Sequence, residues 1–157
     1  MTRLILILPF LSLTINAGEA DPRIARIRKI FRQIEAQVKD QAFLYKKKER
    51  YDGYEVSQAV IYIDEKGRVR KLHCEGGTED SAGSGDYYFR KDGTIFFSFV
   101  RGGSVHGCES EVRSYFDSTG RLIKRLRKDG KQCPAMWFYP LKIGDPERAY
   151  ANCCFRN

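Results

Sequence analysis

Residues 86–100 read DYYFRKDGTIFFSFV: two runs of aromatic and β-branched residues joined by a short polar turn that ends in Gly93. A glycine at that point supplies the positive φ that a tight hairpin loop requires. The same order of strand, polar turn, glycine and strand occurs again in residues 59–72 and 112–126. The glycines that end the three turns lie 26 and 27 residues apart: Gly67, Gly93 and Gly120. This internal repeat predicts three successive hairpins, an antiparallel meander of about six strands over residues 56–128.

The segments between and before the hairpins are polar. Residues 76–85 and 101–104 are rich in glycine and serine, so we expect them to be connectors between the hairpins. The charge run at residues 46–50 reads KKKER and is expected to be a solvated lead into the sheet.

An amphipathic helix is predicted ahead of the sheet, over residues 22–41. Asp21 is a favoured N-cap residue, and Pro22 suits the first helical position. Apolar side chains then recur at steps of three and four, which places them along one stripe: Ile24, Ile27, Ile30, Phe31, Ile34 and Val38. A basic amphipathic helix can also bind a membrane surface, but the strands need a cover, which favours packing on the sheet. The fold class is therefore α+β, with the N-terminal helix packed on a curved antiparallel sheet.

The composition suits one compact domain. Of the 157 residues 42% are hydrophobic and 13% aromatic, enough to bury a core and to exclude wholesale disorder. The chain carries 28 Lys and Arg against 20 Asp and Glu, a formal net charge of +8. No apolar run reaches the roughly 18 residues that a membrane-spanning helix needs. We therefore expect a single basic globular domain over residues 21–157, with no transmembrane segment.

Residues 1–20 have the three-part order of a secretory signal peptide. Arg3 precedes an apolar run over residues 4–13, and small residues follow. Cleavage fits after Ala20 or after Ala17. The remaining protein is expected to be exported and soluble.

The hairpins resemble a group of uncharacterised exported bacterial proteins that have an N-terminal helix before a YYF-DxxG type of β-meander. The resemblance is carried by Tyr-Tyr-Phe at residues 87–89 with the turn at 92–93, and by Tyr-Phe-Asp at residues 115–117 with Gly120. It covers residues 22–128 and implies a bacterial envelope setting, periplasmic or extracellular. It carries over no activity and no catalytic residue.

Five cysteines in an exported domain are typical of a disulfide framework. They are Cys74, Cys108, Cys133, Cys153 and Cys154. Because five is odd, at most two bridges form and one thiol is left over. The preferred pairing joins Cys74 to Cys108 within the sheet and Cys133 to Cys153 or Cys154. The second bond staples the C-terminal segment, residues 131–157, which we expect to be mostly irregular. Neighbouring cysteines bridge each other only with strain, so a bond between Cys153 and Cys154 is not expected.

The two histidines lie close in sequence to cysteines, as His73-Cys74 and His106-Gly107-Cys108. These are ligand types that hold zinc, and a histidine beside a thiolate can support nucleophilic catalysis. Adjacent residues of a strand point to opposite faces, however, and an oxidising compartment favours a disulfide. We therefore expect no metal, cofactor or catalytic residue. The alternative is a periplasmic hydrolase or thiol-dependent enzyme that uses His73 or His106 with a cysteine.

The third hairpin carries the most concentrated positive charge. Its candidate binding residues are Arg113, Arg121, Lys124, Arg125 and Arg127. Such a surface attracts anions, here an acidic protein or an anionic component of the envelope, whereas nucleic acid is not expected as a partner of an exported protein. The sequence therefore favours a non-catalytic exported binding or interaction protein of the envelope over an enzyme.

Overall fold

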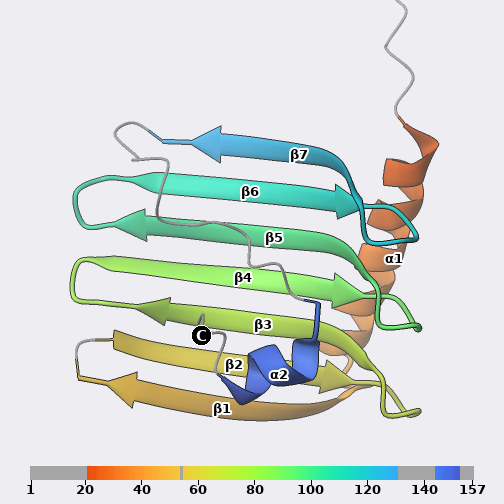
Figure 1. The fold of residues 1–157 in the computed structure, drawn as a ribbon, viewed down its shortest axis with the longest axis horizontal. Helices are drawn as coiled ribbons and strands as arrows, with labels where there is room; N and C mark the ends of the chain where they lie inside the picture. The colour runs from red at the N-terminus through yellow and green to blue at the C-terminus, as the bar shows by residue number, and fades with distance from the viewer. Residues whose placement is uncertain (1–20, 54, 131–143, 153–157) are drawn as a thin grey trace, which may run out of the picture.

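A single antiparallel sheet with a helix on each face makes up the fold (Figure 1). The computed structural model describes residues 21–53, 55–130 and 144–152. In chain order the elements are α1 (Pro22–Lys39), β1 (Leu44–Asp52), β2 (Glu55–Ile63), β3 (Val69–Gly77), β4 (Ser81–Phe89), β5 (Ile95–Ser104), β6 (Glu109–Phe116), β7 (Leu122–Asp129) and α2 (Pro146–Ala151). Each strand pairs with its neighbours in sequence, so the spatial order is β1 to β7 without a crossover. The predicted α+β meander with an N-terminal helix is confirmed.

The two faces of the sheet are named here after the helices that cover them. On the α1 face, the helix crosses the strands near one end of the sheet, and the opposite ends extend beyond it (Figure 1). On the α2 face, the short helix packs against β2 and β3. Because side chains alternate along a strand, Lys71 and His73 of β3 belong to the α1 face, and Leu72 and Cys74 to the α2 face.

Each face has its own hydrophobic core. The buried residues on the α1 face are Ile24, Ile27, Ile34, Phe43, Tyr88, Phe96, Phe97 and Tyr115. Those on the α2 face are Ala59, Ile61, Val69, Leu72, Cys74, Tyr87, Phe89 and Val100. Burial of a large apolar side chain contributes about 1.5–3 kcal/mol, so these two clusters are the main source of stability.

Helix α1 begins and ends where its local sequence dictates. The Asp21 carboxylate accepts a hydrogen bond from the backbone N–H of Arg23, and Pro22 occupies the first helical position. The last turn closes at Asp40, and Gln41 then adopts a positive φ of 56° that no further helical turn could accommodate. The helix therefore stops two residues short of the predicted range of 22–41.

The three-fold repeat in the sequence has a structural counterpart in the strand register. The pairing shifts by one residue at equivalent places in the three hairpins: between Tyr62 and Ile63, Tyr88 and Phe89, and Tyr115 and Phe116. Each irregularity lies next to one of the glycine turns, where a bulge increases the local twist. The glycines that end these turns all have a positive φ, as expected: Gly67, Gly93 and Gly120.

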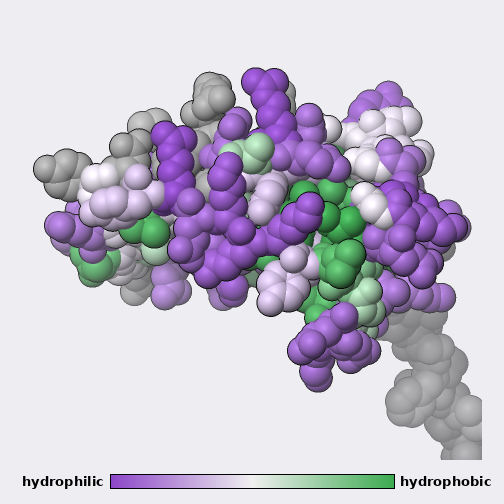
Figure 2. All heavy atoms as spheres, turned by 90° about the horizontal axis from the view of Figure 1, so that it is seen from below, coloured by the Kyte–Doolittle hydropathy of each residue, from purple (hydrophilic) through white to green (hydrophobic). Residues whose placement is uncertain are grey.

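The prediction of about six strands was wrong, because the sheet has seven. The additional strand is β1, which contains the charge run at residues 46–50. All its described side chains are exposed, so it lacks the alternation of apolar and polar residues by which a strand is usually found. Lysine is a common protective residue on an edge strand. Seen from this edge, the surface is mostly hydrophilic, and hydrophobic side chains gather mainly toward the end that α1 crosses (Figure 2).

The expected connectors are parts of strands. β3 runs to Gly77 and β4 starts at Ser81, which leaves residues 78–80 as the turn, and β5 includes residues 101–104. Backbone pairing with both neighbours holds these glycine-rich stretches extended although their own propensity for strands is low. The propensity argument therefore misplaced the ends of three strands.

The C-terminal segment was predicted to be mostly irregular, and residues 146–151 of it form the short helix α2. The Asp145 carboxylate accepts a hydrogen bond from the backbone N–H of Arg148, and Pro146 opens the helix. Residues 131–143 and 153–157 lie outside the described part of the chain. Among the described residues, no helix has the length and apolar character needed to cross a membrane.

Candidate functional site

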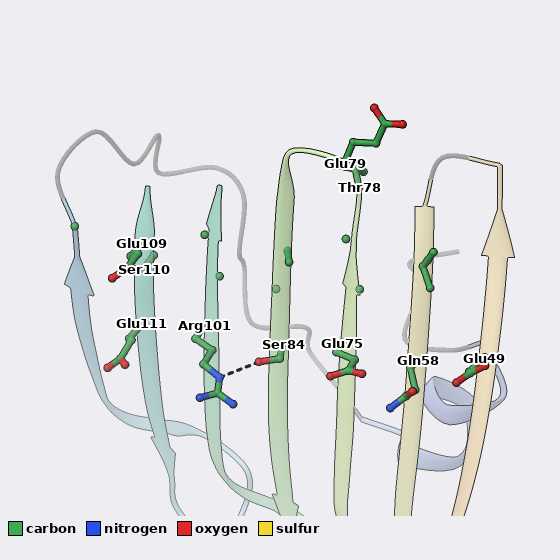
Figure 3. A pocket seen from close by; sticks show the side chains of 18 of the residues that line it. Glu49, Gln58, Glu75, Thr78, Glu79, Ser84, Arg101, Glu109, Ser110 and Glu111 are labelled. Carbon is green, nitrogen blue, oxygen red and sulfur yellow. Dashed lines mark hydrogen bonds between the residues drawn. The ribbon is translucent and has the colours of Figure 1, made fainter. Parts of the chain in front are cut away.

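A groove lies on the α1 face, at the end of the sheet that the helix leaves open (Figure 3). Its volume is about 980 Å³. A row of polar side chains lines it, one from each of the strands β1 to β6: Glu49, Gln58, Glu75, Ser84, Arg101 and Glu111. Neighbouring strands are about 4.8 Å apart, so this row spans about 24 Å from β1 to β6.

The floor of the groove is flat because its central side chains are small. Gly77, Ala82 and Gly103 are paired neighbours on β3, β4 and β5 in the row beside the polar one. Close backbone contacts at the hairpin ends leave no room for a side chain at Gly77 or Gly103. A Cβ atom on Gly77 would lie 2.5 Å from the carbonyl oxygen of Ser81, and one on Gly103 would lie 2.8 Å from that of Cys108.

Three carboxylates of the groove are held by cations that lie one row closer to α1. The pairs are Lys47 Nζ with Glu49 Oε1 at 2.7 Å, His73 Nε2 with Glu75 Oε2 at 3.2 Å, and Arg113 with Glu111 Oε2 at 3.1 Å. In each pair the partners are two residues apart on one strand, so they share a face. Such partly exposed pairs add little stability, but they orient the carboxylates and reduce the net charge of the groove.

A buried polar network lies between the groove and α1, centred on Lys71. The Lys71 ammonium is 2.8 Å from Glu35 Oε1 of α1 and 3.2 Å from Asp86 Oδ1 of β4. The hydroxyl of Tyr88 donates a second hydrogen bond to Glu35 Oε1, at 2.9 Å. Burial alone would lower the pKa of Lys71, but its attraction to Asp86 and Glu35 outweighs burial and raises it. Lys71 is therefore a charged link that joins the helix to the sheet.

His73 joins this network to the groove. Its Nδ1 is 2.9 Å from Asp86 Oδ1, and its Nε2 is 3.2 Å from Glu75 Oε2. The hydrogen bond to Asp86 raises the pKa of His73 against the opposing effect of burial. When the ring is protonated, both nitrogens donate to these carboxylates and no lone pair is left to accept a proton. His73 is therefore unsuited to act as a general base in this state.

The linkage of His73 to folding predicts a specific pH dependence. Its folded-state pKa is raised above the ordinary value of 6.5, so its contribution is fully present below that value and is lost as pH rises through the folded-state pKa. We expect the free energy of unfolding of the His73→Gln variant to fall less between pH 6 and pH 9 than that of the wild type. Urea unfolding at several pH values measures the difference. His106→Gln, at an exposed turn position, is the control, and an equal slope in all three proteins would contradict the interpretation.

The five basic residues predicted to bind an anion do not lie on one face. Arg113 and Lys124 are on the α1 face, Arg125 and Arg127 on the α2 face, and Arg121 is in the turn between β6 and β7. Three of them form ion pairs: Arg113 with Glu111, Arg121 with Asp117, and Arg127 with Asp129. An acidic partner stays a prediction, but these residues are spread over both faces of the sheet and a turn and form no single patch.

The residues of the alternative catalytic hypothesis are also separated. His73 lies within β3, whereas His106 is exposed in the turn between β5 and β6. Cys74 points to the opposite face from His73, as the strand periodicity predicted. Among the described residues, no group of three or more His, Cys, Asp or Glu is placed to hold a metal ion.

The preferred bond between Cys74 and Cys108 was wrong. Cys74 pairs with Gly85 on β4, which pairs in turn with Val100 on β5, so Cys74 is three strand spacings from β6. That separation is about 14 Å before the offset along the strands is added, and a disulfide requires Cα atoms within about 7 Å. No disulfide therefore joins two of the described cysteines.

Both sulfurs are nevertheless disulfide-bonded. The other three cysteines, Cys133, Cys153 and Cys154, lie outside the described residues.

Sequence reasoning missed the groove and the Lys71 network. One local signal was available, because oppositely charged residues two apart on a predicted strand share a face, as His73 and Glu75 do. The row across six strands had no such signal, since it depends on the register of five hairpin pairings. Comparisons with protein-family models, curated proteins and solved structures found no match to this chain.

Proposed function

We propose that this protein is a non-catalytic exported binding protein of the bacterial envelope, and that its ligand site is the groove on the α1 face. The observation that carries the proposal is the polar row that lines an open groove across six strands. Ligand sites are usually clefts in which a few placed polar groups fix the orientation of the ligand. The row is also held in place from behind, because three of its carboxylates are ion-paired.

The state of the groove residues supports binding without catalysis. Both ring nitrogens of His73 lie within hydrogen-bonding distance of carboxylates, those of Asp86 and Glu75. The hydroxyl of Ser84 accepts a hydrogen bond from Arg101 Nε at 3.0 Å, and a guanidinium cannot take a proton from a nucleophile. Ser110, which also lines the groove, donates its hydroxyl to the Asp129 carboxylate at 2.9 Å. Arg127 binds the same carboxylate and lowers the pKa of Asp129, so this carboxylate is a weak base for activating a nucleophile.

Export is supported by the signal-peptide pattern of residues 1–20 and by the oxidised state of Cys74 and Cys108. Disulfides persist in oxidising compartments and are rare in the cytosol. Export further predicts that the purified protein begins at Asp21 or at Gly18, which intact mass measures.

We further propose that two disulfides staple the C-terminal segment to the sheet, the first between Cys108 and Cys133. The backbone N–H of Gly130 donates to the carbonyl oxygen of Glu109, which places Gly130 beside the residue that follows Cys108. Cys133 is three residues further along the chain. Chain connectivity thus favours Cys133 as the partner of Cys108.

The second proposed bridge joins Cys74 to Cys153 or Cys154. The Lys48 ammonium donates to the carbonyl oxygen of Ala151, the last residue of α2. Lys48, Ala59 and Cys74 form one row across β1, β2 and β3, so the end of α2 lies near Cys74. Cys153 and Cys154 come two and three positions after Ala151, and the cysteine that does not bond to Cys74 is left as a free thiol.

The binding proposal is tested by filling the groove. Ser84→Trp places a large side chain at the centre of the polar row, on an interior strand. We expect at least one of three probes at millimolar concentration, a neutral hexasaccharide, hexalysine or hexaglutamate, to raise the melting temperature of the wild type and not that of the variant.

Ser118→Trp, in the turn between β6 and β7, is the control for the added bulk. An equal rise in all three proteins, or no rise with any probe, would show that the groove is not a binding site.

A further inference from the structure

We propose that the groove takes a neutral chain rich in hydroxyl groups, an oligosaccharide strand laid across β1 to β6. The inference rests on the proposed function, since it names the ligand class of the same groove.

The first argument is the balance of charge in the groove. Two cations line it, Arg101 and Lys128. Against them stand five carboxylates: Glu49, Glu75, Glu79, Glu109 and Glu111. The next row adds Lys47, His73 and Arg113, which pair with groove carboxylates, and the carboxylate of Asp86, which pairs with His73 and Lys71. With His73 counted as a cation, these groups are six carboxylates against five cations, close to balance, although the whole chain carries +8. A strongly charged ligand would gain little here from complementary charge.

The second argument is the mixture of hydrogen-bonding types along the row. Carboxylates such as Glu75 only accept, Arg101 only donates, and Gln58 and Ser84 do both. A sugar hydroxyl both donates and accepts, so a polyhydroxylated chain can satisfy every member of the row. A polylysine chain would place like charges opposite Arg101, and a polyglutamate chain would place like charges opposite the carboxylates.

The third argument is shape. The row extends about 24 Å across the strands, room for a chain of several sugar rings. The floor of Gly77, Ala82 and Gly103 leaves a flat surface against which rings can lie. At the β1 end, Tyr51 lines the groove and is 74% exposed, an amphipathic ring available for stacking.

The experiment is calorimetric titration of the exported chain, residues 21–157 with its disulfides intact, with linear neutral hexasaccharides of glucose and of N-acetylglucosamine. Hexalysine and hexaglutamate are the charged comparisons. We expect a neutral hexasaccharide to bind with an affinity that changes little as salt is raised, because no net charge is neutralised. Gln58→Ala and Arg101→Met should each weaken binding by up to about tenfold, the loss of one or two hydrogen bonds.

Matched controls are Gln37→Ala and Arg26→Met, which change the same residue types at exposed positions of α1. They should leave the affinity unchanged. Salt-sensitive binding of hexalysine or hexaglutamate that is lost in the groove variants would overturn the oligosaccharide assignment while the proposed binding function stands. Failure of every neutral hexasaccharide to bind would also overturn it. Equal losses in the groove and α1 variants would contradict both proposals.

Discussion

Replacing Cys74 with Ser is expected to lower the free energy of unfolding by about 2–5 kcal/mol, the usual range for loss of a native disulfide. The proposed bond from Cys74 to Cys153 or Cys154 closes a loop of roughly 80 residues, and long loops restrict the unfolded chain most. The sulfur is also buried in the core of the α2 face, beside Ala149 and Tyr150 of α2. Urea unfolding of the oxidised proteins measures the loss.

Two comparisons make the disulfide prediction specific. Of the variants Cys153→Ser and Cys154→Ser, one should have the same free energy of unfolding as Cys74→Ser and the other that of the wild type, because only one of these residues is bridged. The losses from Cys74→Ser and Cys108→Ser should add in the double variant, since they break different bonds. A double variant no less stable than either single one would mean that Cys74 and Cys108 share a bond. Peptide mapping without reduction would then find that bond directly.

Replacing Lys71 with Ala is expected to cost about 3–5 kcal/mol, the usual result when one partner of a buried ion pair is removed. The substitution leaves the carboxylates of Glu35 and Asp86 without their shared cation. It also removes the ammonium from the faces of Tyr62 and Tyr88, whose ring centroids lie 5.7 Å and 5.2 Å away. Thermal or urea unfolding measures the effect.

Lys66→Ala is the control for the Lys71 prediction, because Lys66 is exposed in the turn between β2 and β3. A second variant, Lys71→Ala with Glu35→Gln, should recover part of the loss by removing one uncompensated charge. If Lys71→Ala costs no more than Lys66→Ala, the ammonium does not link α1 to the sheet.

The parts of the fold that could be predicted are those with local chemical signals. Asp21-Pro22 marks the start of α1, and turn glycines such as Gly93 mark the hairpins. The same Asp-Pro signal at Asp145-Pro146 opens α2 and was available in the sequence. β1 could not be found in this way, because an exposed edge strand needs no apolar alternation and is held by pairing with β2 alone.

The candidate site was harder to predict because it is a property of the register. Glu49, Glu75 and Glu111 come together only because each hairpin aligns its strands at one particular offset, and each bulge beside a turn shifts that offset by one residue. The same dependence explains the wrong cysteine pairing. Cys74 lies on β3 and Cys108 directly before β6, and nothing in their spacing reveals that three strand intervals separate them.

The most direct measurement of the central claim is an amide ¹⁵N–¹H spectrum of residues 21–157, recorded with and without the neutral hexasaccharide, hexalysine and hexaglutamate. The groove account predicts that a binding probe moves the signals of Gly77, Ser84, Arg101 and Gly103 and leaves those of the turn at Arg121 unchanged. Movement confined to residues 121–127 would place binding on the third hairpin and contradict the groove. A spectrum unchanged by all three probes would contradict it as well.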